Sequence, residues 1–332
     1  MISVEKVSKY YGAHRAVTDL SFEIGDGECV GFLGLNGAGK STTLRLLSCL
    51  LLPTSGRVTV RGLDVVAHPH EIRRFIGYLP ESPPLYMEMT VKEYLTFAGH
   101  VRGLSGAELD KGRARSIELC NVGDVAHKII GTLSHGYRQR VGIAQAIIHG
   151  PSLLILDEPI QGLDPVQIVD MRNMIKALRG EHTVLLSTHI LTEIEHTCDR
   201  ILMMHEGRLA AQGSEEQLAA KLSSSRKLEV EVRGTEESLR GALAAVAAVS
   251  ELEISGKGKG EGILLAKLQV ADADREQVSR ALVQAGLGLL TMRLVSTGLE
   301  AVFIQLSSGA ASGPSSETRT GSETDADSGV GE

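Results

Sequence analysis

The chain has 332 residues, of which 42% are hydrophobic and 23% charged, and its formal net charge is -7. This length predicts one large domain with a smaller one, or two domains, and the negative charge argues against nucleic acid as the main partner. The four cysteines have no paired spacing, which fits a reducing cytosol and neither a disulfide framework nor a zinc site. Without a signal-peptide layout or an apolar run of about 18–20 residues, we expect a soluble chain that can still dock on a membrane protein.

The first two-thirds of the chain read as an α/β core with a helical insert. Residues 1–24 predict two short strands around a turn, and a strand, a glycine-rich loop and a helix follow, with a proline stop at Pro53. About three amphipathic helices are expected over residues 90–148. The apolar runs PSLLILDEP and HTVLLSTHI suit buried parallel strands, each followed by a helical pattern, and a hairpin turning at Glu206-Gly207 closes this part.

A domain boundary is expected near residues 221–228. Beyond it, strands alternate with helices over 235–247 and 273–285 in a βαββαβ order, which predicts a small ferredoxin-like α+β domain with TGLEAVFIQL as its closing helix. The last segment is rich in serine, glycine, threonine and acidic residues, and we expect it to be disordered. The expected units are therefore a first domain over 1–222, a second over 226–306 and a tail over 307–332.

A phosphate-binding loop is the strongest chemical signal in the chain. GLNGAGKS, from Gly34 to Ser41, matches GxxxxGK[ST] between a predicted strand and a predicted helix. Its glycines let backbone N–H groups wrap the phosphates, Lys40 neutralises the β- and γ-oxygens, and Ser41 supplies an oxygen to Mg²⁺. The alternative is a glycine-rich turn that carries Lys-Ser by chance. The expected ATP-binding residues of the loop are Gly34, Leu35, Asn36, Gly37, Ala38, Gly39, Lys40, Ser41 and Thr42.

Two adjacent acids end the strand of LLILDEP. Asp157 would bind Mg²⁺ at the carboxyl edge of the sheet, and Glu158 is the expected general base that polarises the attacking water. His189 follows the strand TVLLST and is interpreted as a sensor of the γ-phosphate. The alternatives are solvated turn acids and a structural histidine.

A second anion site is predicted where LSHGYRQR begins an amphipathic helix. Ser134 lies at the helix start and Gly136 follows within the first turn, so free N–H groups and the positive end of the helix dipole lie beside a hydroxyl. The phosphate-binding loop already provides a better site for the chain's own nucleotide. The residues alone leave open whose phosphate this helix binds.

The ordered set of motifs resembles the ATP-binding cassette (ABC) ATPase family over residues 2–220. The set consists of Tyr11, GLNGAGKST, GYLPE, LSHGYRQR, LILDEP, GLD and His189. The resemblance implies that two cassettes meet head to tail as a homodimer, so that Ser134 and Gly136 contact the ATP held by the partner. It also implies that Tyr11 stacks on adenine, with Tyr10 as the fallback, and that Asp164 bridges to the opposite cassette.

The chain departs from the usual family pattern at four positions. His135 and Tyr137 replace a glycine and the glutamine of the more usual LSGGQ, while Gln161 stands where serine is frequent. Glu81 stands where a glutamine usually contacts Mg²⁺ and water, and a carboxylate there can still bind the metal.

These motif sequences resemble those of the ATPase subunits of type-two exporters, with the gliding-motility-associated subgroup as the nearest resemblance. The resemblance implies an ATPase on the cytoplasmic face of the cell membrane, working with a separate permease that sets the substrate. The permease would dock near Glu81 and residues 84–104, although ordinary core packing would also explain the aromatic residues there. The alternatives are a soluble ABC ATPase on ribosomes or DNA, which usually carries basic tracts, and an added small-molecule sensor over residues 226–306.

Overall fold

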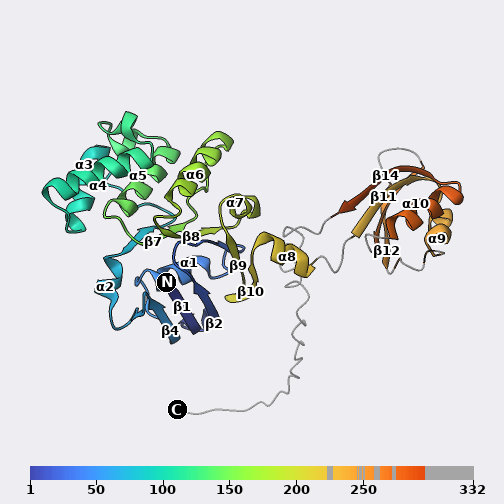
Figure 1. Ribbon diagram of the computed structural model, residues 1–332, viewed down its shortest axis with the longest axis horizontal. Helices are drawn as coiled ribbons and strands as arrows, with labels where there is room; N and C mark the ends of the chain where they lie inside the picture. Colours follow the sequence, from blue (N-terminus) through green and yellow to red (C-terminus); the bar gives the residue numbers. More distant parts are fainter. Residues whose placement is uncertain are drawn as a thin grey trace, which may run out of the picture.

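The computed structural model (Figure 1) describes residues 1–222, 227–244, 246, 249, 251–257, 262–270 and 274–295. Three expectations lie outside these residues: the disordered tail over 307–332, the closing helix TGLEAVFIQL, and the linker residues 223–226 within the expected boundary. Among the described residues, no helix combines the length and the hydrophobicity that crossing a bilayer requires.

The first sheet is antiparallel and has the strand order β2-β1-β4-β5. Its strands are β1 (Ile2–Tyr11), β2 (His14–Ile24), β4 (Ser55–Val60) and β5 (Leu63–Asp64). The two strands expected at the start of the chain are present, but with 10 and 11 residues they are longer than the short strands expected. A tight turn at Gly12, whose φ is 59°, joins them.

The second sheet has the strand order β10-β9-β3-β8-β7-β6 and is parallel except for its edge strand β10. Its strands are β3 (Cys29–Leu33), β6 (Ile76–Leu79), β7 (Leu153–Asp157), β8 (Thr183–Thr188), β9 (Arg200–His205) and β10 (Arg208–Gly213). Every residue of β3, β7 and β8 is buried, as expected for parallel strands covered on both faces. The hairpin turn at Glu206-Gly207 is confirmed.

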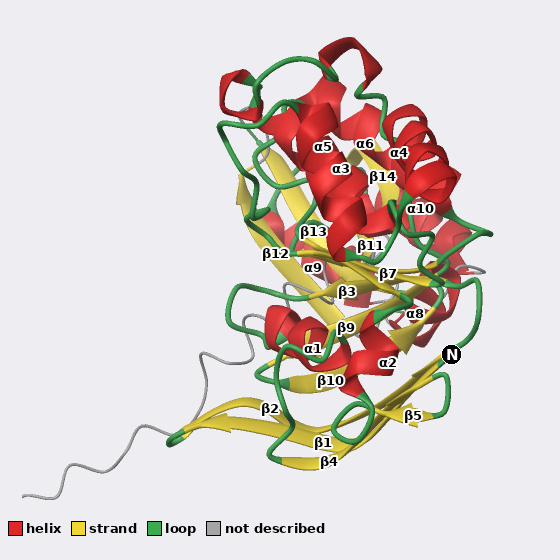
Figure 2. Ribbon diagram, turned by 90° about the vertical axis from the view of Figure 1, so that its left-hand side faces the viewer, coloured by secondary structure: helices red, strands yellow, loops and turns green. Residues whose placement is uncertain are grey.

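Helix α1 (Lys40–Leu47) lies between the two sheets (Figure 2). Its Leu44 and Leu47 share a core with Phe22 of the first sheet and Ile155 of the second. The helix ends before the expected stop at Pro53, because Cys49 takes a positive φ of 59°, and a left-handed residue ends the run of i→i−4 hydrogen bonds.

Helices cover the opposite face of the second sheet. The expected insert is confirmed as α3 (Val91–Val101), α4 (Gly106–Leu119) and α5 (His135–Ile147), and α6 (Pro165–Leu178) packs with them. Leu154 and Leu156 of β7 face this helical core, while Leu153 and Ile155 face α1, so one strand joins the two layers. The remaining helices of this part are α2 (Pro69–Arg73), α7 (Leu191–Glu195) and α8 (Glu215–Leu222).

The described residues after 226 form a four-stranded antiparallel sheet with the strand order β12-β13-β11-β14. In chain order its elements are β11 (Lys227–Arg233), α9 (Glu236–Ala244), β12 (Glu251–Lys257), β13 (Ile263–Gln269), α10 (Arg275–Gln284) and β14 (Gly288–Val295). This is the βαββαβ order expected from the sequence. Leu228, Val230, Leu239 and Leu282 are buried in a core that belongs to this sheet and its two helices.

Candidate nucleotide-binding site

The predicted site residues meet at the carboxyl edge of the parallel strands. The glycine-rich loop follows β3, Asp157 is the last residue of β7, and His189 follows the last residue of β8. Glu81 comes two residues after β6 ends at Leu79. Ligands of open α/β sheets bind at this edge, because the loops that follow neighbouring parallel strands come together there.

The glycine-rich loop needs glycine at two positions, Gly37 and Gly39. Gly37 and Gly39 have φ values of 85° and 96°, which strongly favour glycine. A Cβ on Gly39 would also lie 2.6 Å from the carbonyl oxygen of Ala16 on β2, so the loop rests directly on that strand. Gly39 is the N-cap of α1 and no side chain caps this helix, which leaves its first N–H groups available for an anion.

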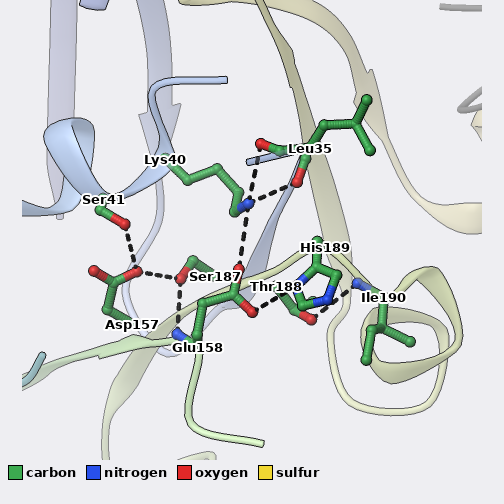
Figure 3. A network of polar contacts seen from close by, with 10 residues as sticks. Leu35, Lys40, Ser41, Asp157, Glu158, Ser187, Thr188, His189 and Ile190 are labelled. Carbon is green, nitrogen blue, oxygen red and sulfur yellow. Dashed lines mark hydrogen bonds and ion pairs between the residues drawn. The ribbon is translucent and has the colours of Figure 1, made fainter. Parts of the chain in front are cut away.

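Lys40 is buried, and its ammonium group is held at the centre of the site (Figure 3). Its Nζ donates to the carbonyl oxygen of Gly34 at 2.6 Å and forms an ion pair with Glu158 Oε1 at 3.3 Å. The side chains of Lys40 and Glu158 are only 6% and 7% exposed. A buried cation is therefore present where the phosphates would lie, paired in this state with the predicted general base.

Asp157 is held by two hydroxyls and keeps one oxygen free of protein partners. Ser41 Oγ and Ser187 Oγ donate to its Oδ1 at 3.1 and 2.6 Å, whereas Oδ2 is buried and makes no hydrogen bond. Because an unpaired buried carboxylate oxygen is costly, the donor set fits a hard cation such as Mg²⁺, bound directly or through water. Burial first, and the Asp157 charge second, raise the pKa of Tyr78 on β6, so its hydroxyl stays protonated.

Glu158 has a strained backbone. Its φ is 48°, in the left-handed region that side chains other than glycine rarely occupy, and such strain concentrates at functional sites. Its N–H donates to Ser187 Oγ at 3.0 Å, and its Oε2 lies 3.0 Å from His189 Nδ1 (Figure 3). The turn after β7 thus aims the carboxylate between Lys40 and His189.

A cleft of about 330 Å³ opens above these groups. It is lined by Tyr11, His14, Ala16, Leu35, Asn36, Gly37, Gly39, Lys40, Ser41, Thr42, Glu81, Glu158 and Gln161. Tyr11 is 45% exposed and lines the cleft, whereas Tyr10 is not among the lining residues. This favours Tyr11 over Tyr10 as the stacking residue.

The second predicted anion site lies outside this cleft. Ser134 is the N-cap of α5, where its Oγ accepts from the N–H of Tyr137 at 3.4 Å, and neither Ser134 nor Gly136 lines the cleft. A Cβ on Gly136 would lie 2.7 Å from Oε1 at the flexible end of the Gln167 side chain, so Gly136 packs closely on α6. Asp164 is exposed as the N-cap of α6.

Sequence reasoning missed Ser187 and the lining residue His14. Ser187 bonds both Asp157 and the N–H of Glu158, and β7 pairs with β8 in a register that sets Asp157 opposite Ser187. The only signal was a serine near the end of the strand TVLLST, two residues before His189. Its partner could not be named before the strand register was known.

The fold and the site define a P-loop nucleoside triphosphatase, since the loop, the buried lysine and the two acids surround one cleft at the sheet edge. Residues 17–161 match the family described as ABC transporter. The ABC transporter ATP-binding protein YxlF of Bacillus subtilis (strain 168) is 42% identical over 218 residues, which cover 66% of this chain and 72% of that one. The chain belongs to the ABC transporter ATP-binding proteins and is an ATPase of this class.

Two further proteins extend this similarity. The Nod factor export ATP-binding protein I of Rhizobium sp. (strain N33) is 34% identical over 308 residues, covering 92% of this chain and 96% of that one. The dimeric structure of a post-hydrolysis state of the ATP-binding cassette MJ0796, bound to ADP and Pi, matches with a TM-score of 0.60 and 26% identity. It covers 64% of this chain and 98% of the MJ0796 chain.

Proposed function

We propose that the chain is the ATP-hydrolysing subunit of a bacterial exporter, driving a separate permease through ATP-dependent dimerisation. The observation that carries the proposal is the division of the phosphate-binding groups. One set surrounds the cleft, while the helix N-terminus at Ser134 lies outside it. A second copy of the chain, placed head to tail, would bring Ser134 and Gly136 onto the nucleotide of its partner. The similarity to a Nod factor export ATP-binding protein supports a role in export, and the similarity to a dimeric cassette structure supports a dimer.

In the proposed mechanism, Lys40 leaves Glu158 for the β- and γ-phosphates when ATP binds. Glu158 then accepts a proton from the attacking water, and His189 donates a hydrogen bond to the γ-phosphate. Ser41, Asp157 and Glu81 would hold Mg²⁺, which when bound neutralises phosphate charge during the transfer. Nucleotide held between two subunits stabilises the closed dimer, so hydrolysis weakens it and returns the subunits to the open state.

The action of Ser134 across the dimer interface can be tested with an arginine. Ser134→Arg should abolish the cooperative part of ATP hydrolysis, because a bulky cation would occupy the space of the partner's γ-phosphate. The affinity of the isolated subunit for ATP should stay the same, since Ser134 does not line the chain's own cleft. Ser105→Arg is the matched control, at the exposed N-cap of α4. Loss of ATP binding by the monomeric Ser134→Arg subunit would contradict the assignment.

The permease would dock on an aromatic patch formed by Tyr86, Met87 and Phe97, which are 49%, 44% and 40% exposed. The rings of Tyr86 and Phe97 meet edge to face with centroids 5.2 Å apart, whereas Tyr94 behind them is buried. Tyr86 and Met87 follow the cleft residue Glu81 along the chain. A cluster of exposed apolar side chains favours a protein partner.

Purification from detergent-solubilised membranes tests the permease. The wild-type chain should bring down a polytopic membrane protein, and Phe97→Asp should reduce its recovery. Val66→Asp is the control, since Val66 is also an exposed apolar side chain but lies outside the patch. If the wild-type chain recovers ribosomes or DNA instead, it is a soluble ABC ATPase that works without a transporter.

We also propose a peripheral position on the cytoplasmic face of the membrane and a ferredoxin-like fold for residues 226–306. The strand order β14-β11-β13-β12 and the two helices between its strands support the fold assignment. Membership of the gliding-motility-associated subgroup is proposed on the spelling of GYLPE and LSHGYRQR.

A further inference from the structure

His135 forms a hydrogen bond that has no role in the mechanism proposed above. It is the first residue of α5, next to Ser134, and its Nε2 lies 3.0 Å from the backbone carbonyl oxygen of Gln161. A carbonyl oxygen can only accept, so Nε2 carries the hydrogen and donates it. Gln161 lines the chain's own nucleotide cleft. One hydrogen bond therefore joins the segment that faces the chain's own nucleotide to the helix start that would face the partner's.

A second contact joins the same two segments. Gly162, which follows Gln161, has a φ of 74°, and the chain then reaches the N-cap of α6 at Asp164. One turn into α6, the side chain of Gln167 packs so closely on Gly136 that a Cβ there would lie 2.7 Å from its Oε1. The segment from Gln161 to Gln167 thus contacts the first turn of α5 at both of its ends.

We infer that His135 is a positioning residue that couples the two nucleotide sites of the dimer through its hydrogen bond to the Gln161 carbonyl. The inference rests on the proposed head-to-tail dimer. A nucleotide that moves Gln161 in its own cleft displaces the acceptor of this bond, and the start of α5 moves with it toward or away from the partner's nucleotide. The coupling is an interaction between two distinct sites through a defined contact.

Three single variants of the full-length chain test the inference. His135→Ala removes the donor, and His135→Gln retains an N–H donor at the same position. Tyr137→Phe is the matched control, since it removes one polar contact from the same helical turn, the 2.6 Å hydrogen bond to Asp124 Oδ2, without touching Gln161. For each chain, the rate of ATP hydrolysis is measured against ATP concentration, and ATP affinity is measured on dilute subunits by equilibrium binding.

The wild-type chain should show a Hill coefficient above one. In His135→Ala the Hill coefficient should fall to one and the maximal rate should fall roughly two- to tenfold, the range for the net loss of one hydrogen bond, with the ATP affinity of the dilute subunit unchanged. His135→Gln should restore most of both losses, and Tyr137→Phe should keep the wild-type Hill coefficient.

The inference is overturned if His135→Ala remains cooperative, if His135→Gln is as impaired as His135→Ala, or if Tyr137→Phe loses cooperativity equally. Failure of the proposed dimer gives a different result. In that case the wild-type chain itself hydrolyses ATP without cooperativity and forms no ATP-dependent dimer.

Discussion

Replacing Glu158 by glutamine would separate the role of the site in ATP hydrolysis from its role in ATP binding. The substitution keeps the size of the side chain and removes its charge and its capacity to accept a proton. In the structure the carboxylate lies 3.3 Å from Lys40 Nζ and 3.0 Å from His189 Nδ1, with little exposure to water. The variant therefore loses the proposed base and, at the same time, replaces the ion pair with Lys40 by a weaker hydrogen bond to a neutral amide oxygen.

The size of each effect follows from this geometry. Loss of a general base slows turnover by roughly 10²- to 10⁴-fold, or about 3–5 kcal/mol in the barrier. At 3.3 Å and an effective dielectric of about 20, the Coulomb attraction of the ion pair is about 5 kcal/mol before the desolvation cost, which offsets most of it. The amide oxygen of the variant can still accept from Lys40. We therefore expect the free energy of unfolding of the nucleotide-free variant to be only about 1–3 kcal/mol lower than that of the wild-type chain.

The assay combines three measurements on Glu158→Gln and the wild-type chain. Steady-state hydrolysis should be nearly abolished, the affinity for ATP should not fall, and a sizing column should show a dimer that persists in ATP and is absent without it. Glu88→Gln is the matched control, since Glu88 is exposed and does not line the cleft. Hydrolysis by Glu158→Gln at the wild-type rate would refute the reasoning and remove Glu158 from the role of base.

Two other predictions concern a buried hydroxyl and a buried imidazole. Ser187→Ala removes the donor to Asp157 and the side-chain acceptor for the Glu158 N–H, so the free energy of unfolding should fall by about 1–3 kcal/mol and Mg²⁺-dependent ATP binding should weaken. Urea unfolding and nucleotide titration check this against Ser105→Ala, an exposed serine, and unchanged values in both would contradict it. Burial first, then the charge of Arg102, lowers the pKa of His149 from 6.5 to about 4, and its Nδ1 is buried with no partner to accept an added proton. The unfolded chain therefore takes up this proton first, so the stabilising contribution is complete above pH 6.5 and is lost as the pH falls toward about 4. Between pH 7.5 and 5.0 the wild-type chain should lose about 2 kcal/mol more than His149→Asn, and equal losses in urea unfolding would count against the assignment.

Local patterns were enough to predict the strands, the helical insert and the phosphate-binding loop. GLNGAGKS and LILDEP are each an unbroken stretch of sequence. The first follows a strand and leads into a helix, and the second ends a strand, so their place at the sheet edge follows from the fold class. The head-to-tail action of Ser134 came only from the family resemblance, because no single chain displays it.

Contacts between segments far apart in the chain could not be predicted from the sequence. The bond of Ser187 to Asp157 depends on strand register, and the bond of His135 to Gln161 depends on how α5 packs beside α6. The positive φ of Glu158 also went unpredicted, since the sequence there shows neither glycine nor asparagine. The end of α1 at Leu47, rather than nearer Pro53, was set by the backbone of Cys49.

Because Gly39 packs closely on Ala16, the phosphate-binding loop takes its conformation when the chain folds and not when the triphosphate binds. Gly207 makes a similar approach, since a Cβ there would lie 2.7 Å from the same Ala16 oxygen, and its N–H donates to the carbonyl of Ala38. A loop that is anchored on two sides loses little conformational freedom when an anion binds. The entropy cost of ordering the loop therefore falls on folding, and it does not reduce the affinity for the ligand.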